Sequence, residues 1–142
     1  MPVAVTLEEA LKDWSWLLQT DDLEVVNSTC LGDVIFIDRQ GALQILDVVA
    51  GQVHLLDLKE EQQIAAMPNL IAKLEAQGLM IKEGQCYALK PNSIFKEFVA
   101  ENLYVSPLPE YVSFMGDFHR QIKDLPDGTK FRFKVINEGL IQ

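Results

Sequence analysis

The sequence contains few of the residues from which metal sites and disulfide frameworks are built. Its 142 residues include two cysteines, Cys30 and Cys86, and two histidines, His54 and His119, with no CxxC, HxxxH or HExxH spacing among them. A structural metal site needs three or four clustered ligands, and two cysteines are too few for a disulfide framework. We therefore expect two reduced thiols, no metal ion and no cofactor.

The sequence also lacks long apolar runs and an export signal. No run approaches the roughly 20 apolar residues that cross a bilayer. The first residues, MPVAVTLEEALKDWSW, turn acidic early and have no basic segment followed by an apolar one, as a signal peptide has. These absences predict a soluble protein of the cytoplasm that has no contact with membranes.

Basic residues are scarce in the first part of the chain. The net charge is -9, with twelve acidic and three basic residues up to Glu61 and nine of each after it. Such an excess repels nucleic acid and attracts basic partners, so direct binding of nucleic acid is not expected. Two interpretations stay open: a surface that keeps the protein soluble, and an acidic patch that faces a partner.

The residues needed for catalysis are not grouped by any motif. No glycine-rich phosphate loop or dinucleotide signature occurs. His54 lies in the middle of a predicted strand, and His119 is two positions from Asp117, a spacing that points two helical side chains to different faces. We expect no catalytic residues and a protein that is not an enzyme.

The remaining pattern predicts a single α+β domain over residues 1–142. Helical spacing over 7–19, 59–66, 68–77 and 109–123 alternates with short period-2 segments separated by turns. We expect an antiparallel meander sheet of about five to seven strands, with an N-terminal helix, a middle helical pair and a C-terminal helix packed on it. Val34 to Ile37 is apolar on both faces and should be a central strand covered on both sides, and KFRFKVI, from Lys130, should be a strand with one basic face.

Several short motifs occur in a fixed order along the chain. They are Leu31-Gly32-Asp33-Val34-Ile35-Phe36, Asp38-x-x-Gly41, Gly84-Gln85-Cys86-Tyr87, and the run His119, Gln121, Ile122, Asp124, Leu125, Pro126, Asp127, Gly128 and Thr129. Together they resemble the C-terminal domain family of bacterial type VI secretion DNase immunity proteins, formerly a domain of unknown function. The resemblance covers residues 31–136, is strongest over 84–130, and leaves the helix and first strand of residues 1–30 poorly matched.

Two departures separate this chain from the family pattern. Pro91 and the pair Glu101-Asn102 are present, but the residues from Ile94 to Val99 replace the Leu-Gly-Gly that commonly follows the proline. Many members also have a longer N-terminal companion domain, in place of which this chain has the helix and strand of residues 1–30. The shared motifs can be explained as a core strand and a turn, so they are interpreted as features of the fold rather than as toxin contacts.

The resemblance implies a cytoplasmic immunity protein that binds and neutralises a cognate effector toxin, a nuclease, without catalysis. Nucleases engage phosphate and are usually basic around the site, which suits an acidic partner. The expected contacts are the acidic residues of the 21–61 segment and one exposed tryptophan: Glu24, Asp38, Asp47, Asp57, Glu60, Glu61 and Trp16.

Three other points stay open. Trp16 could be an interface anchor or a residue packed at the edge of the core. A stand-alone small-molecule or regulatory binding module without a toxin partner is the alternative function, and an enzyme, which would need a pocket with converging titratable groups, is the third. The sequence does not reveal the oligomeric state or the identity of the partner.

Overall fold

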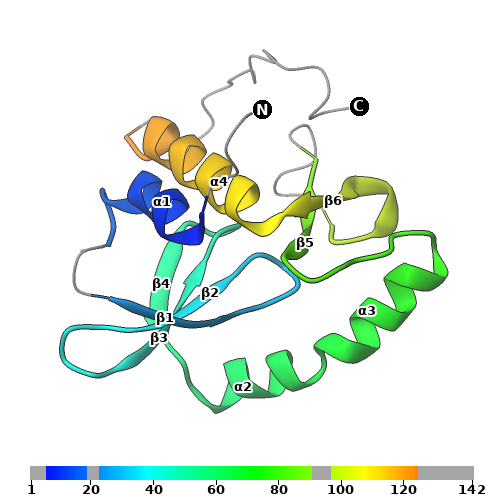
Figure 1. The fold of residues 1–142 in the computed structure, drawn as a ribbon, viewed down its shortest axis with the longest axis horizontal. Helices are drawn as coiled ribbons and strands as arrows, with labels where there is room; N and C mark the ends of the chain where they lie inside the picture. The colour runs from blue at the N-terminus through cyan, green and yellow to red at the C-terminus, as the bar shows by residue number, and fades with distance from the viewer. Residues whose placement is uncertain (1–5, 19–22, 91–96, 125–142) are drawn as a thin grey trace.

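A computed structural model describes residues 6–18, 23–90 and 97–124 of the chain. These residues form an α+β fold in which a four-stranded sheet lies between two helical layers (Figure 1). Helices α1 and α4 lie side by side on one face of the sheet, and α2 and α3 run along the other side of the molecule. The predicted fold class is confirmed.

The four-stranded sheet is the predicted meander. Strands β1 (Glu24–Ser28), β2 (Val34–Ile37), β3 (Leu43–Asp47) and β4 (Gln52–Leu55) follow one another in the order β1-β2-β3-β4, and each pairs antiparallel with the next. The β2–β3 turn is closed by Gly41, whose φ of +82° suits glycine, as predicted from its sequence. Strand β2 is interior and buried, which confirms its predicted central place.

The remaining strands form a second sheet. β5 (Gln85–Leu89) and β6 (Leu103–Pro107) pair antiparallel with each other and not with the meander. The described residues therefore contain two sheets, whereas we expected one sheet of about five to seven strands. The predicted strand from Lys130 lies outside the described residues.

The helices match their predicted places with small differences. α1 (Leu7–Leu11) is shorter than expected, because the chain tightens into the 3-10 helix η1 (Lys12–Trp14), a common way for a helix to end. The middle pair is α2 (Leu58–Ala65) and α3 (Met67–Ala76), with Pro68 in the first turn of α3. A 3-10 turn, η4 (Ala100–Asn102), precedes β6, and α4 (Leu108–Ile122) follows it.

The hydrophobic core lies between the meander and the layer of α1 and α4, and it continues into β5, β6 and one residue of α3. Trp14 is fully buried there, and its indole N–H donates to the carbonyl of Val112 at 2.8 Å. Gly116 lets the two helical segments approach, because a Cβ at this position would lie 2.8 Å from both the Asp13 carbonyl and the Trp14 ring. Val34, Phe36 and Leu46 supply the sheet side of this core.

Candidate functional site

Three of the predicted acidic contacts occupy the first turn of α2. Asp57 caps the helix, because its carboxylate accepts the backbone N–H of Glu60 at 2.9 Å. Glu60 and Glu61 follow within the same turn, where negative side chains interact favourably with the helix dipole. We call Asp57, Glu60 and Glu61 the α2 acidic group.

The α2 acidic group is joined to the sheet by one ion pair. The Nε2 of His54, in the middle of β4, lies 2.8 Å from the Oε1 of Glu60. His54 pairs with Ile45 across the β3–β4 ladder, so both side chains are on the sheet face that α2 covers. His54, interpreted from the sequence as a structural or surface residue, therefore holds α2 against the meander.

A cavity of about 400 Å³ separates α2 from the sheet. None of the eight residues of α2 is buried, which shows that the helix covers the sheet without packing closely on it. The walls of this α2 cavity combine apolar and charged side chains: Leu31, Asp33, Ile45, Asp47, Val49, His54, Lys59, Glu60, Gln63, Ile64, Met67 and Phe98.

Three carboxyl groups line the α2 cavity, those of Asp33, Asp47 and Glu60. Burial, together with the nearby charges of Asp47 and Glu60, raises the pKa of Asp33 to about 7. The Thr29 hydroxyl, 3.4 Å from the Asp33 carboxyl, and the backbone of Val48 oppose this rise in pKa. Asp33 therefore changes charge near neutral pH.

Asp47 was predicted as a partner contact, and its carboxylate accepts hydrogen bonds from the backbone of the turn that follows it. One of its carboxylate oxygens accepts the backbone N–H groups of Val49 at 3.1 Å and Ala50 at 3.0 Å. Its negative charge nevertheless remains on the wall of the α2 cavity. In the described part of the chain, neither Asp33 nor Asp47 forms an ion pair with a lysine or an arginine.

The structure places Glu24 and Asp38 away from the α2 cavity. Glu24 lies opposite Ile37 across the β1–β2 ladder, and Asp38 follows Ile37, so both acids are at the end of the sheet beside the β2–β3 turn. The carboxylate of Asp38 accepts the backbone N–H groups of Gln40 and Ala42, both at 2.9 Å, and the side-chain amide of Gln44.

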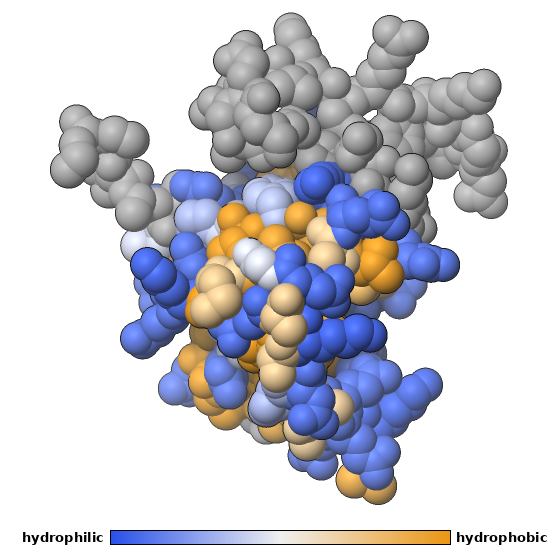
Figure 2. Space-filling model, turned by 90° about the vertical axis from the view of Figure 1, so that its right-hand side faces the viewer, coloured by the Kyte–Doolittle hydropathy of each residue, from blue (hydrophilic) through white to orange (hydrophobic). Residues whose placement is uncertain are grey.

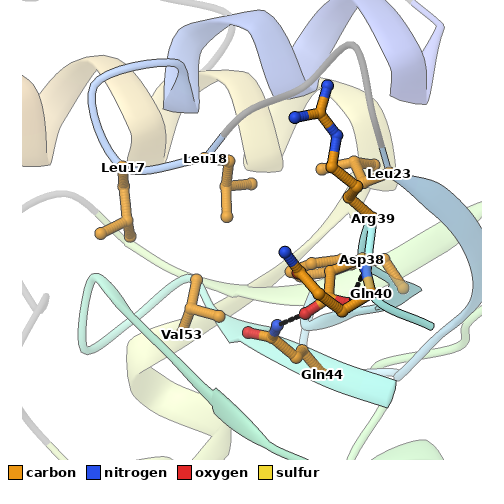
Figure 3. A pocket seen from close by; sticks show the side chains of 9 residues that line it. Leu17, Leu18, Leu23, Asp38, Arg39, Gln40, Gln44 and Val53 are labelled. Carbon is orange, nitrogen blue, oxygen red and sulfur yellow. Dashed lines mark hydrogen bonds between the residues drawn. The ribbon is translucent and has the colours of Figure 1, made fainter. Parts of the chain in front are cut away.

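A second cavity, of about 430 Å³, lies beside Asp38 (Figure 3). Its other walls include Leu17, Leu18 and Val53, and the Asp38–Gln44 hydrogen bond lies along its edge. Because the Asp38 carboxylate already accepts three hydrogen bonds, this cavity offers less uncompensated charge than the α2 cavity does.

Trp16 lies against α4. Its ring stacks on Trp14 with 5.6 Å between ring centroids, and its indole N–H donates to the carbonyl of Gly116 at 3.2 Å. Trp14 is buried and Trp16 is half-buried, as their spacing predicts. The polar group of Trp16 is used inside the molecule, so its role as an interface anchor stays a prediction.

The second histidine and the two thiols have structural surroundings. Burial lowers the pKa of His119, whose Nε2 lies 3.0 Å from the carbonyl of Val48 and 3.1 Å from that of Val49. Burial raises the pKa of Cys30 to about 11 and that of Cys86 to about 12, and a thiol that stays protonated is a poor nucleophile. Burial and these contacts place His119 and Cys86 within the packing of the fold and leave Cys30 half-buried.

Of the residues that line the α2 cavity, only Asp47 and Glu60 were predicted as contacts, and the titratable residues Asp33, His54 and Lys59 were missed. Asp33 and Asp47 each adjoin a turn, and Glu60 is on a helix. These three residues come together only because α2 packs over the sheet, which the sequence pattern does not show. The one available signal was Asp33 itself, an acid directly before a strand that is apolar on both faces.

The surface near α2 also carries exposed leucines. Leu55, at the end of β4, and Leu58, the first residue of α2, are 63% and 68% exposed. They adjoin the α2 acidic group in the chain, and an apolar centre with a charged rim is the usual composition of a protein interface.

Figure 2 shows a different face of the molecule. Hydrophobic residues gather in the upper part of its coloured surface, and hydrophilic residues dominate the lower part.

The described residues contain no group of three or more His, Cys, Asp or Glu side chains that could hold a metal ion. Over the same residues, no helix has the length and apolar character needed to cross a bilayer. The candidate site described above consists of the α2 cavity, the α2 acidic group and the two exposed leucines.

Comparison with known proteins found no relative. No protein-family model matches the chain, and neither the curated proteins nor the solved structures contain a match. The resemblance to type VI secretion DNase immunity proteins therefore stays a prediction from the motifs.

Proposed function

We propose that this protein is a non-enzymatic immunity protein of the bacterial cytoplasm that binds and neutralises a cognate, basic nuclease-type effector of a secretion system. The partner docks on α2 and the end of β4. The observation that carries this proposal is the α2 acidic group beside the exposed leucines Leu55 and Leu58. Three carboxylates within one helical turn would attract a basic surface, and the leucines would supply apolar area to bury.

The other predicted contacts contribute to the proposal unequally. Asp38, Asp47 and Asp57 each accept backbone hydrogen bonds within their own turn or cap, so local structure alone explains why an acid is present. Glu61 makes no such contact among the described residues and is exposed. Glu61 is therefore the acid whose presence the fold explains least and a partner would explain best.

The proposal is tested by co-expression with the product of the adjacent gene in cells that this product otherwise kills. We expect survival and stable co-purification of the two proteins. Replacing Glu60 and Glu61 by lysine should weaken the complex at least about tenfold, with the loss mainly in the association rate at low salt. Glu83→Lys, which reverses one exposed charge far along the chain from α2, serves as the control and should leave affinity unchanged.

Death of the co-expressing cells, with the two proteins eluting separately, would contradict the proposal. Survival with equal affinity for the α2 variants and the Glu83→Lys control would keep the immunity function and reject α2 as the contact surface. The two results are distinguishable because one reads viability and the other reads affinity.

A second candidate function is a stand-alone small-molecule or regulatory binding module. The α2 cavity favours it, because its volume of about 400 Å³ is in the range of small-ligand pockets. A ligand that raises the melting temperature of the isolated protein, together with the absence of a neighbouring toxin gene, would support this function over the first.

A further inference from the structure

We propose that the α2 cavity receives one basic side chain, an arginine or a lysine, from the surface of the protein partner. This inference rests on the proposed function for the existence of the partner, but the chemistry of the cavity can be tested without it. The proposal is argued from the shape of the cavity, from the charges on its walls and from the loose packing of α2.

The walls of the cavity match the two parts of a long basic side chain. Ile45, Val49 and Ile64 supply an apolar surface on which the methylene stem would lie. Asp33, Asp47 and Glu60 would face the charged end, which can donate several hydrogen bonds at once. A neutral or an acidic side chain would leave these carboxyl groups uncompensated.

The charges on the walls do not cancel. Three carboxyl groups face one lysine, Lys59, and one histidine, His54, and the histidine is already paired with Glu60. Asp33 and Asp47 have no lysine or arginine partner among the described residues. A cation entering the cavity would supply the positive charge that the fold itself does not provide.

The protonation of Asp33 would respond to a cation bound in the cavity. Burial and the two neighbouring carboxylates raise its pKa to about 7, so a large fraction of Asp33 is protonated at neutral pH. A bound cation would favour the ionised form and lower this pKa, which means that binding would release protons.

The loose contact of α2 gives the partner access to the cavity. No residue of α2 is buried, and the ion pair from His54 to Glu60 is exposed to solvent at both side chains, by 38% and 22%. Movement of α2 away from the sheet at the edge of the cavity therefore breaks few contacts. A basic side chain adjoining the exposed Leu58 would enter where the partner also finds apolar area.

The direct test uses a probe pair that differs in charge and little in shape. n-Butylguanidinium reproduces the end of an arginine side chain, and n-butylurea is its neutral counterpart. Each is titrated into the full chain while backbone amide shifts are followed by NMR. We expect saturable shifts in β3, β4 and α2 with n-butylguanidinium, a Kd on the order of 1 mM for so small a ligand, and at least about tenfold weaker binding of n-butylurea.

Matched variants locate the probe. Asp33→Asn and Glu60→Gln each remove one ionisable carboxyl group from the cavity wall with little change of shape, and each should weaken n-butylguanidinium binding about fivefold or more. Glu83→Gln removes the same charge at an exposed position that does not line the cavity, and should leave binding within about twofold. Calorimetry in two buffers of different ionisation enthalpy should show proton release at pH 7 in the parent chain and much less in Asp33→Asn.

The outcomes separate this inference from the proposed function. Absence of saturable binding, equal binding of n-butylurea, or an equal loss in Glu83→Gln would overturn the cation site, whatever the co-expression experiment shows. Probe binding with the expected variant pattern, but without survival of the co-expressing cells, would support the cation site and contradict the immunity function. Capture of the toxin with affinity unchanged in Asp33→Asn and Glu60→Gln would support the function and overturn the inference.

Discussion

The two faces of the four-stranded sheet are covered in different ways. On one face, α1, η1 and α4 enclose a core around Trp14, which is fully buried and hydrogen-bonded to α4. On the other face, α2 has no buried residue and stands over a cavity of about 400 Å³. The first face therefore holds a closely packed core, and the second holds a cavity with apolar and charged walls.

The largest effect should come from Trp14. Trp14→Ala removes the largest fully buried side chain and its hydrogen bond to Val112, and should lower the free energy of unfolding by about 4 kcal/mol. Chemical denaturation measures the loss. Leu58→Ala on the other face should cost less than about 0.5 kcal/mol, because the side chain is 68% exposed. Similar losses for the two variants would contradict the contrast between the faces.

A smaller effect should appear where α4 meets the β3–β4 turn. Gly51 has a φ of +70°, and a Cβ on it would lie 2.7 Å from the Nδ1 of His119. Gly51→Ala should therefore destabilise the protein by about 2 kcal/mol, from backbone strain and from the clash. In a His119→Ala background the clash is absent, so the cost of Gly51→Ala should fall to about 1 kcal/mol. An unchanged cost would show that the ring does not restrict this turn.

The next prediction concerns Asp33 in the α2 cavity, whose contribution to the free energy of unfolding depends on pH. Asp33 keeps its proton up to about pH 7 in the folded protein, against an ordinary pKa of 3.8 in the unfolded chain. Between these values the folded state binds more protons than the unfolded state, so the stability contributed by Asp33 falls as the pH rises and is lost above about pH 8.

Comparison of the parent chain with Asp33→Asn isolates this dependence. The stability of the parent relative to Asp33→Asn should fall by about 1 to 2 kcal/mol between pH 4 and pH 8.5, the partial exposure of the side chain reducing the effect. Unfolding titrations at several pH values measure it. A relative stability that stays constant over this range would show that Asp33 is ionised throughout.

The smallest effect on stability should come from the exposed acid of the α2 acidic group. Glu61→Gln should change the free energy of unfolding by less than about 0.5 kcal/mol, because the side chain is exposed and makes no ion pair among the described residues. The same residue reversed to lysine should impair partner binding, so a variant that is neutral for stability would still affect function. A large loss of stability in Glu61→Gln would place this residue in the fold rather than in the contact surface.

The sheet face covered by α1 and α4 was more predictable from the sequence than the α2 cavity was. Short period-2 segments joined by turns gave the meander, and the apolar run of β2 indicated its interior position. The division into two sheets could not be predicted, because alternation shows which residues share a face and not which distant strands pair. β5 and β6 pair with each other and not with β4, the strand that precedes β5 in the chain.

The candidate site illustrates the same limit. Glu60 and Glu61 were predicted as contacts from charge alone, and they do lie together in the first turn of α2. Asp33 was missed, because its altered pKa depends on Asp47 and Glu60, which approach it only after α2 crosses the sheet. The pKa of Asp33 therefore depends on residues that lie far from it in the chain and close to it in the fold.

Native-state hydrogen exchange on the full chain tests the contrast between the two faces most directly. Backbone amides of β2 and α4 should exchange only on global unfolding, whereas those of α2 should exchange by local opening at least about a hundredfold faster. Protection of α2 equal to that of α4 would contradict the account, because α2 would then be as firmly fixed to the sheet as the helices of the core.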